Sequence, residues 1–98
     1  MEKKYFAMKL LPNRPDFAQT MTADERAVMM AHVAYWKGIM AQGKVLVFGP
    51  VLDPGAVYGL GIVAVDDEKE VEEFIAGDPA STINTYVYHP MRAVVPEK

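Results

Sequence analysis

The sequence predicts an α+β fold in which four strands and two helices follow one another in the order β-α-β-β-α-β. Two observations support this prediction: short apolar runs bounded by glycine and proline, and two longer segments with apolar residues at helical spacing. About half of the 98 residues are hydrophobic, which is enough for a core without disulfides. We therefore expect residues 1–98 to form a single domain.

Four segments are predicted to be strands, because each is rich in apolar residues and bounded by turn-forming residues. They are residues 5–11, 44–49, 58–65 and 85–95. Pro90 lies within the last of these. Proline cannot donate a hydrogen bond to a neighbouring strand, so this segment is expected to be an edge strand or to contain a bulge.

The first helix is predicted over residues 22–42. Thr22 and Glu25 have the spacing of a capping box. In this motif the threonine hydroxyl accepts a hydrogen bond from the backbone N–H of the glutamate, and the glutamate carboxylate accepts one from the backbone N–H of the threonine. Gly43 follows as a left-handed terminator. A second helix is predicted over residues 68–76, where apolar residues line one edge. Between the first strand and the first helix, residues 13–21 are predicted to be a loop.

This order of elements is the ferredoxin-like βαββαβ pattern, in which two helices cover one face of a four-stranded antiparallel sheet. The strands carry apolar residues at both odd and even positions, as in the run from Val45 to Phe48. The face without helices therefore exposes apolar side chains. We expect a homodimer in which two such faces pack together, which makes a dimeric α+β barrel.

Composition and spacing exclude several classes of protein. The chain has no cysteine, so disulfides, thiolate metal sites and a cysteine nucleophile are excluded. The net charge is −3 and no basic block is present, so no nucleic acid partner is expected. Without a signal-peptide core or a membrane-spanning apolar run, we expect a cytoplasmic protein with no membrane association. No histidine spacing predicts a metal, and no glycine-rich turn predicts a phosphate-bearing cofactor.

His32 is the strongest candidate for chemistry. It falls within the apolar stripe of the first helix, between Val28 and Trp36. A lone histidine on such a face is more often a core residue with one hydrogen-bond partner than a catalyst. The alternative interpretation is a general acid or base whose orientation is fixed by a carboxylate.

The loop over residues 49–55 offers such a carboxylate. Asp53 stands there among two prolines and two glycines, which can hold a loop in one shape, and Gly55 is predicted to have positive φ. A plain turn is the simpler interpretation of the same residues. If the first helix packs beside the second strand, His32 and Asp53 are predicted to form a hydrogen-bonded catalytic pair.

Four further residues are candidates for binding a small-molecule substrate: Tyr35, Trp36, Tyr58 and Arg14. Tyr35 and Trp36 would form an aromatic wall beside the histidine, although core packing is the simpler interpretation of Trp36. Tyr58 is a second wall residue or a phenol donor. Arg14 is either a solvated charge or a contact for an anion.

Taken together, these residues resemble the YCII-like family over nearly the whole chain. The matching features are His32 and Tyr35 in the first helix, Gly43 at its end, Gly49-Pro50, Asp53 and Gly55 in the loop, and Asp78-Pro79 after the second helix. The resemblance implies a ferredoxin-like dimeric barrel with a His-Asp pair, which corresponds to His32 and Asp53. Ala80 departs from the aromatic residue that family members often have there, so the identity of the substrate does not transfer.

The resemblance also implies a cofactor-free enzyme of the lyase or isomerase type that transfers a proton on a small cyclic or aromatic metabolite. The first alternative is a non-catalytic domain that binds a small ligand or a partner. A cofactor-independent monooxygenase on the same barrel is a third hypothesis. The enzyme hypothesis requires a pocket in which His32 lies within hydrogen-bond distance of Asp53.

Overall fold

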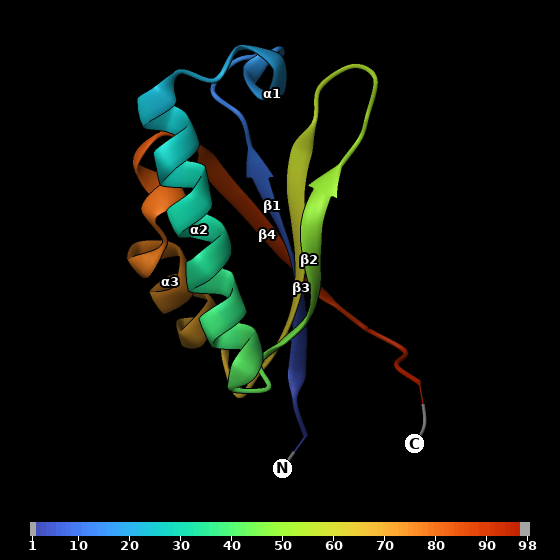
Figure 1. The fold of residues 1–98 in the computed structure, drawn as a ribbon. Coiled ribbons are helices and arrows are strands. Elements are labelled where there is room, and N and C mark those ends of the chain that lie inside the picture. The colour runs from blue at the N-terminus through green and yellow to red at the C-terminus, as the bar shows by residue number, and fades with distance from the viewer. Residues whose placement is uncertain (1, 97–98) are drawn as a thin grey trace.

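The computed structural model describes residues 2–96 and contains the six predicted elements in the predicted order (Figure 1). The strands are β1 (Lys4–Leu11), β2 (Val45–Val51), β3 (Tyr58–Val65) and β4 (Thr85–Met91). The two long helices are α2 (Ala23–Ala41) and α3 (Glu68–Gly77). Two short elements were not predicted: α1 (Phe17–Thr20) and the 3-10 turn η1 (Pro79–Thr82).

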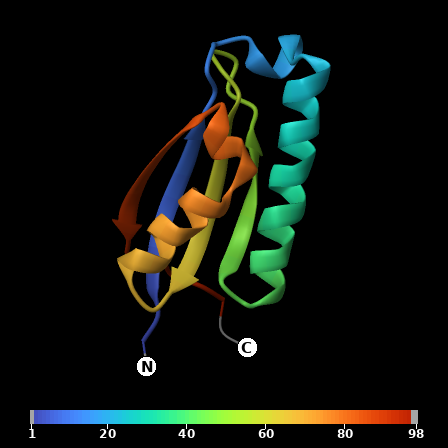
Figure 2. The same ribbon diagram turned by 90° about the vertical axis from the view of Figure 1, so that its left-hand side faces the viewer.

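The strands form one antiparallel sheet in the order β2-β3-β1-β4. β4 pairs only with β1, so the prediction that Pro90 lies in an edge strand is confirmed. Both long helices lie on the same face of the sheet (Figures 1 and 2). The predicted α+β class and ferredoxin-like arrangement are therefore confirmed.

The local signals of α2 act as predicted. The Thr22 hydroxyl accepts from the backbone N–H of Glu25 over 3.1 Å, and the Glu25 carboxylate accepts from the backbone N–H of Thr22 over 3.0 Å. The helix ends before Gly43, which has φ of +82° and is the only positive-φ residue between residues 2 and 96. Gly55 therefore lacks the positive φ that the sequence predicted.

The helix α1 occupies part of the segment that was predicted to be a loop. It is a single turn that begins after Asp16, whose carbonyl accepts from the amides of Gln19 and Thr20. Its Phe17 side chain is 5% exposed and anchors the turn to the rest of the molecule. Four residues are too few to show a helical period, so the sequence pattern could not reveal this turn.

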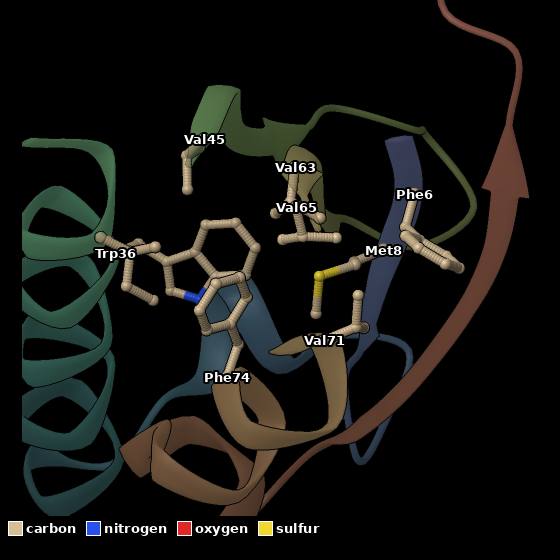
Figure 3. Close-up of a cluster of buried hydrophobic side chains, with 9 residues drawn as sticks. Phe6, Met8, Trp36, Val45, Val63, Val65, Val71 and Phe74 are labelled. Atoms are coloured by element: carbon tan, nitrogen blue, oxygen red, sulfur yellow. The ribbon is translucent and has the colours of Figure 1, made fainter. Parts of the chain in front are cut away.

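The hydrophobic core lies between the sheet and the two long helices (Figure 3). Alternate residues of β1 point into it, because successive side chains of a strand face opposite sides. Trp36 projects from α2 into this core beside Phe74 of α3 and is 2% exposed. Complete burial of a side chain of this kind stabilises the fold by about 2–3 kcal/mol.

The opposite face of the sheet carries no helix and is partly apolar. Gly61 of β3 lies against Trp36, so its cross-strand partner Phe48 faces the helices and the adjacent Val47 faces away. Val47 is 59% exposed, and Val87 and Met91 of β4 are also exposed. This helix-free face therefore offers apolar surface to a partner. None of the described helices is both long and apolar enough to span a bilayer.

Candidate functional site

A cavity of about 520 Å³ lies between α2 and the sheet. Its lining includes residues of α1 and of the loop from β2 to β3, two segments that lie at the same end of the molecule (Figure 1). Its walls come from α1, α2, all four strands and the loops at this end. Most of the lining side chains are apolar, including Met8, Phe17, Met29, Phe48 and Leu52. Partly open apolar pockets of this size with a few polar groups are typical of small-molecule sites.

His32 lines this cavity from the middle of α2. Its Nδ1 atom lies 2.8 Å from Oδ2 and 3.0 Å from Oδ1 of Asp78, and its side chain is 12% exposed. No residue among 2–96 forms a hydrogen bond with Nε2. One ring nitrogen is therefore held by a carboxylate, and the other is free to meet a ligand.

Asp78 is positioned by local backbone structure. It ends α3 and begins η1, where its Oδ1 accepts from the backbone N–H of Ala80 over 2.9 Å. Pro79 follows at the first position of the turn, where its missing N–H costs nothing. The same aspartate that caps the 3-10 turn thus presents its carboxylate to His32.

Three side chains donate to the Asp78 carboxylate. Trp36 donates from Nε1 to Oδ2 over 2.9 Å, the Tyr86 hydroxyl donates to the same oxygen, and His32 donates from Nδ1. Burial of Asp78 would raise its pKa, but these bonds and the one from Ala80 outweigh burial and hold the pKa below its usual value. Asp78 is therefore a carboxylate at neutral pH, although its side chain is fully buried.

The tautomer of His32 follows from this charge. A carboxylate can only accept, so Nδ1 carries the proton and Nε2 of the neutral ring has a free lone pair. Tyr86 also remains protonated, because burial and the neighbouring Asp78 raise the pKa of its phenol. In this tautomer the site presents one base, Nε2, and the buried Asp78 carboxylate holds the ring through Nδ1.

The predicted hydrogen bond between His32 and Asp53 is wrong. The Asp53 carboxylate accepts from the backbone N–H of Gly55 over 2.8 Å, which is the local turn interaction of an exposed aspartate. Strand β2 continues to Val51, two residues beyond the predicted end, so the loop lies further along the molecule. The carboxylate that meets His32 comes instead from the end of α3.

The two aromatic candidates of α2 separate in the structure. Trp36 lines the cavity, four residues after His32 and on the same face of the helix. Tyr35 does not line it, and its hydroxyl donates to the carbonyl of Phe74 over 2.9 Å. Tyr58 borders the cavity at the start of β3, where the Lys9 ammonium lies 4.9 Å from the centre of its ring.

Arg14 also lies outside the cavity. Its guanidinium donates to both carboxylate oxygens of Glu25, at 2.9 and 2.8 Å, and to the backbone carbonyl of Thr20 at 2.7 Å. These bonds occupy the fork of donors that would bind an anion. Arg14 therefore fixes the start of α2 and does not line the cavity.

Three residues of the site were not predicted to belong to it: Asp78, Asn84 and Tyr86. Asp78-Pro79 is one of the features that resemble the YCII-like family, but an aspartate followed by a proline is also typical of a turn that ends a helix. Tyr86 lies at the start of β4, Asn84 directly precedes this strand, and both residues line the cavity. Residues 2–96 contain no group of three or more histidine, aspartate or glutamate side chains that could hold a metal ion.

The fold and this site define a ferredoxin-like α+β protein with a His-Asp pair at an apolar cavity. The chain belongs to the YCII-related family, whose model matches residues 6–93. No curated protein matches it in sequence. A solved structure with the same fold is 5-chloro-2-hydroxyhydroquinone dehydrochlorinase from Burkholderia phenoliruptrix, in complex with 2,5-dihydroxybenzoquinone. The two are 20% identical with a TM-score of 0.65, over 89% of this chain and 93% of that one.

Proposed function

We propose that this protein is an enzyme of the lyase or isomerase type that transfers a proton on a small cyclic or aromatic metabolite, without a cofactor. The observation that carries the proposal is the pairing of His32 Nδ1 with the buried Asp78 carboxylate at 2.8 Å, at the wall of a cavity. This is the arrangement of a base with an orienting group. The predicted roles are kept, but Asp78 replaces Asp53 as the partner.

In the proposed reaction, Nε2 of His32 accepts a proton from the bound molecule. The imidazolium that forms lies against the negative charge of Asp78, which stabilises it, and the apolar walls exclude the water that would compete for the proton. The proton then returns to another atom of the same molecule, as in an isomerase, or leaves with a departing group, as in a lyase. A positioned acid or base of this kind contributes about 10²–10⁴-fold to the rate.

The dehydrochlorinase of the same fold supports the substrate class. Its structure was solved with 2,5-dihydroxybenzoquinone, a six-membered ring with hydroxyl groups. A cavity of about 520 Å³ accommodates a molecule of that size. The alternative is a domain that binds such a ring without acting on it, and the same cavity and histidine serve that role equally well.

Deuterium exchange separates the two functions. Resorcinol and other hydroxylated rings are incubated with the protein in D₂O, and loss of each C–H signal is followed by NMR. We expect exchange by the wild type to exceed that by the His32→Gln variant about 10²–10⁴-fold. Equal rates for both proteins on every ring would contradict the enzyme hypothesis, and binding without exchange would favour the alternative.

We also propose that the helix-free face of the sheet forms a homodimer interface. The exposed apolar side chains of Val47, Val87 and Met91 motivate this proposal. A glutamate there would be buried without a partner, so Val47→Glu is expected to yield a monomer in sedimentation equilibrium at micromolar concentration. Met30→Glu is the matched control, because Met30 is 68% exposed and lies on α2. A monomeric wild type would remove this proposal.

A further inference from the structure

Asn84 has an unusual place in the site. It lies between η1 and β4, where its backbone N–H donates to the carbonyl of Ala80 over 2.9 Å, and it lines the cavity. Its Oδ1 atom is buried and has no hydrogen-bond partner among residues 2–96, the only side-chain nitrogen or oxygen atom there of which this is true. A buried acceptor without a donor destabilises a fold, so a residue of this kind calls for an explanation.

The other end of the amide is only weakly held. Nδ2 of Asn84 donates to the sulfur of Met29 over 3.5 Å, and a thioether is a poor acceptor. The amide can therefore turn about its last bond without losing a strong interaction. Met29 precedes His32 by three residues and shares its face of α2, so Asn84 and His32 meet the same cavity from neighbouring positions.

The charge of the cavity wall limits what can bind there. Its lining contains no lysine, arginine, aspartate or glutamate. The polar side chains at the wall are His32, Asn84, Gln19 and the phenol of Tyr86. A phosphate or carboxylate would lose its hydration without meeting a lysine or an arginine, which is unfavourable. The wall therefore suits a neutral molecule with an apolar body.

We propose that Asn84 is a substrate-binding residue that accepts a hydrogen bond from a hydroxyl group of a neutral, ring-shaped ligand. The unpartnered Oδ1 is buried in this conformation; when the amide turns towards the cavity it supplies the acceptor, and the ligand hydroxyl supplies the donor that the protein lacks. This inference rests on the proposed function for the location of the ligand, and it adds the charge state of the ligand and the group that Asn84 recognises.

A matched pair of probes tests this assignment. Resorcinol carries two hydroxyl donors, whereas 1,3-dimethoxybenzene has the same ring and no donor. The dissociation constant of each is measured by NMR titration for the wild type, Asn84→Leu and Asn84→Asp. Gln19→Ala is the control, because Gln19 lines the same cavity but is exposed, so water can satisfy its amide.

We expect Asn84→Leu to weaken resorcinol binding about 5–10-fold, which is the range for the loss of one hydrogen bond. The dissociation constant of 1,3-dimethoxybenzene is expected to change by less than about twofold, because this probe has no donor for Asn84. Asn84→Asp retains acceptor oxygens and is expected to retain resorcinol binding at pH 8. Gln19→Ala is expected to change neither constant. Equal effects of Asn84→Leu on both probes, or no effect on resorcinol, would overturn the proposal.

The same titrations separate this proposal from the proposed function. His32→Gln is expected to abolish exchange in D₂O while the preference for resorcinol over its ether persists. If the wild type shows that preference but no exchange, Asn84 keeps its role and the enzyme hypothesis fails. If the wild type exchanges protons but Asn84→Leu still distinguishes the two probes, the role of Asn84 fails and the enzyme hypothesis stands.

Discussion

The indole nitrogen of Trp36 lies 2.9 Å from Oδ2 of Asp78, so the only tryptophan of the chain both fills the core and holds the carboxylate that orients His32. Packing of the core and geometry of the site are therefore coupled. The same indole N–H also lies 3.0 Å from the hydroxyl oxygen of Tyr86, which itself donates to Asp78. A change at either aromatic residue acts on the histidine through the carboxylate.

Trp36→Phe tests this coupling, because it removes the N–H donor and keeps an aromatic ring. One donor to a buried carboxylate is lost, so we expect a decrease of about 1.5–3 kcal/mol in the free energy of unfolding, measured with urea. We also expect slower deuterium exchange. Tyr35→Phe is the control, since its hydroxyl bonds to Phe74 and not to Asp78. Equal exchange rates in the two variants would show that Trp36 does not act on the site.

Gly61→Ala should displace the same indole without changing its chemistry. A Cβ atom at Gly61 would lie 2.5 Å from Cζ3 and 2.6 Å from Cη2 of Trp36, so the ring must move. Overpacking of this kind costs about 1–3 kcal/mol of stability. We expect that loss in urea unfolding, together with a shift in tryptophan fluorescence.

Gly49→Ala is the matched control for this change. Gly49 also lies in a strand, but a Cβ atom there would meet nothing within 4 Å. Because alanine restricts the unfolded chain more than glycine does, this variant is expected to be neutral or slightly more stable. Similar losses of stability in Gly61→Ala and Gly49→Ala would contradict the proposed contact with Trp36.

Sequence reasoning succeeded where the determinant is local. The ends of α2 follow from Thr22, Glu25 and Gly43, because each of these residues affects only the backbone a few positions away from it. The edge position of β4 follows from Pro90, because one missing donor is enough to exclude a central strand. The side-chain period, which is two residues in a strand and 3.6 residues in a helix, then decides which residues of each element face the core.

The partner of His32 could not be predicted in this way. Asp78 lies 46 positions away, and its contact with His32 depends on how the end of α3 packs against α2. Asp53 and Asp78 each stand in a turn with proline, and turn chemistry explains each of them fully. Only the packed structure shows that Asp53 serves a turn alone, whereas Asp78 serves a turn and also bonds to His32.

The pH dependence of stability should report the ion pair of Glu25. Hydrogen bonds from Arg14, and from the backbone of Thr22, lower the pKa of Glu25 from 4.5 to about 2. A lowered folded-state pKa contributes stability that is complete above pH 4.5 and is lost as the pH falls towards 2. We therefore expect the urea midpoint of the wild type to decrease across this window.

Glu25→Gln removes this contribution and keeps the capping box, because the side-chain oxygen of glutamine can also accept a hydrogen bond from the backbone N–H of Thr22. In this variant the decrease between pH 4.5 and 2 should be smaller than in the wild type. Asp24→Asn is the control, because it removes another acid from the first turn of α2 without touching the Arg14 pair. An unchanged pH profile for Glu25→Gln would contradict the role of the ion pair.

Asp78→Asn and Asp53→Asn together decide which carboxylate serves His32. Asparagine at position 78 removes the charge that four donors share and turns an N–H towards some of them, so we expect a loss of about 2–3 kcal/mol in the free energy of unfolding. Exchange in D₂O should also decrease, because Nδ1 would no longer be held against an anion. Asp53→Asn changes only an exposed turn and should leave both measurements close to those of the wild type. Exchange that survives Asp78→Asn in folded protein and disappears in Asp53→Asn would restore the original pairing and exclude Asp78 as the orienting group.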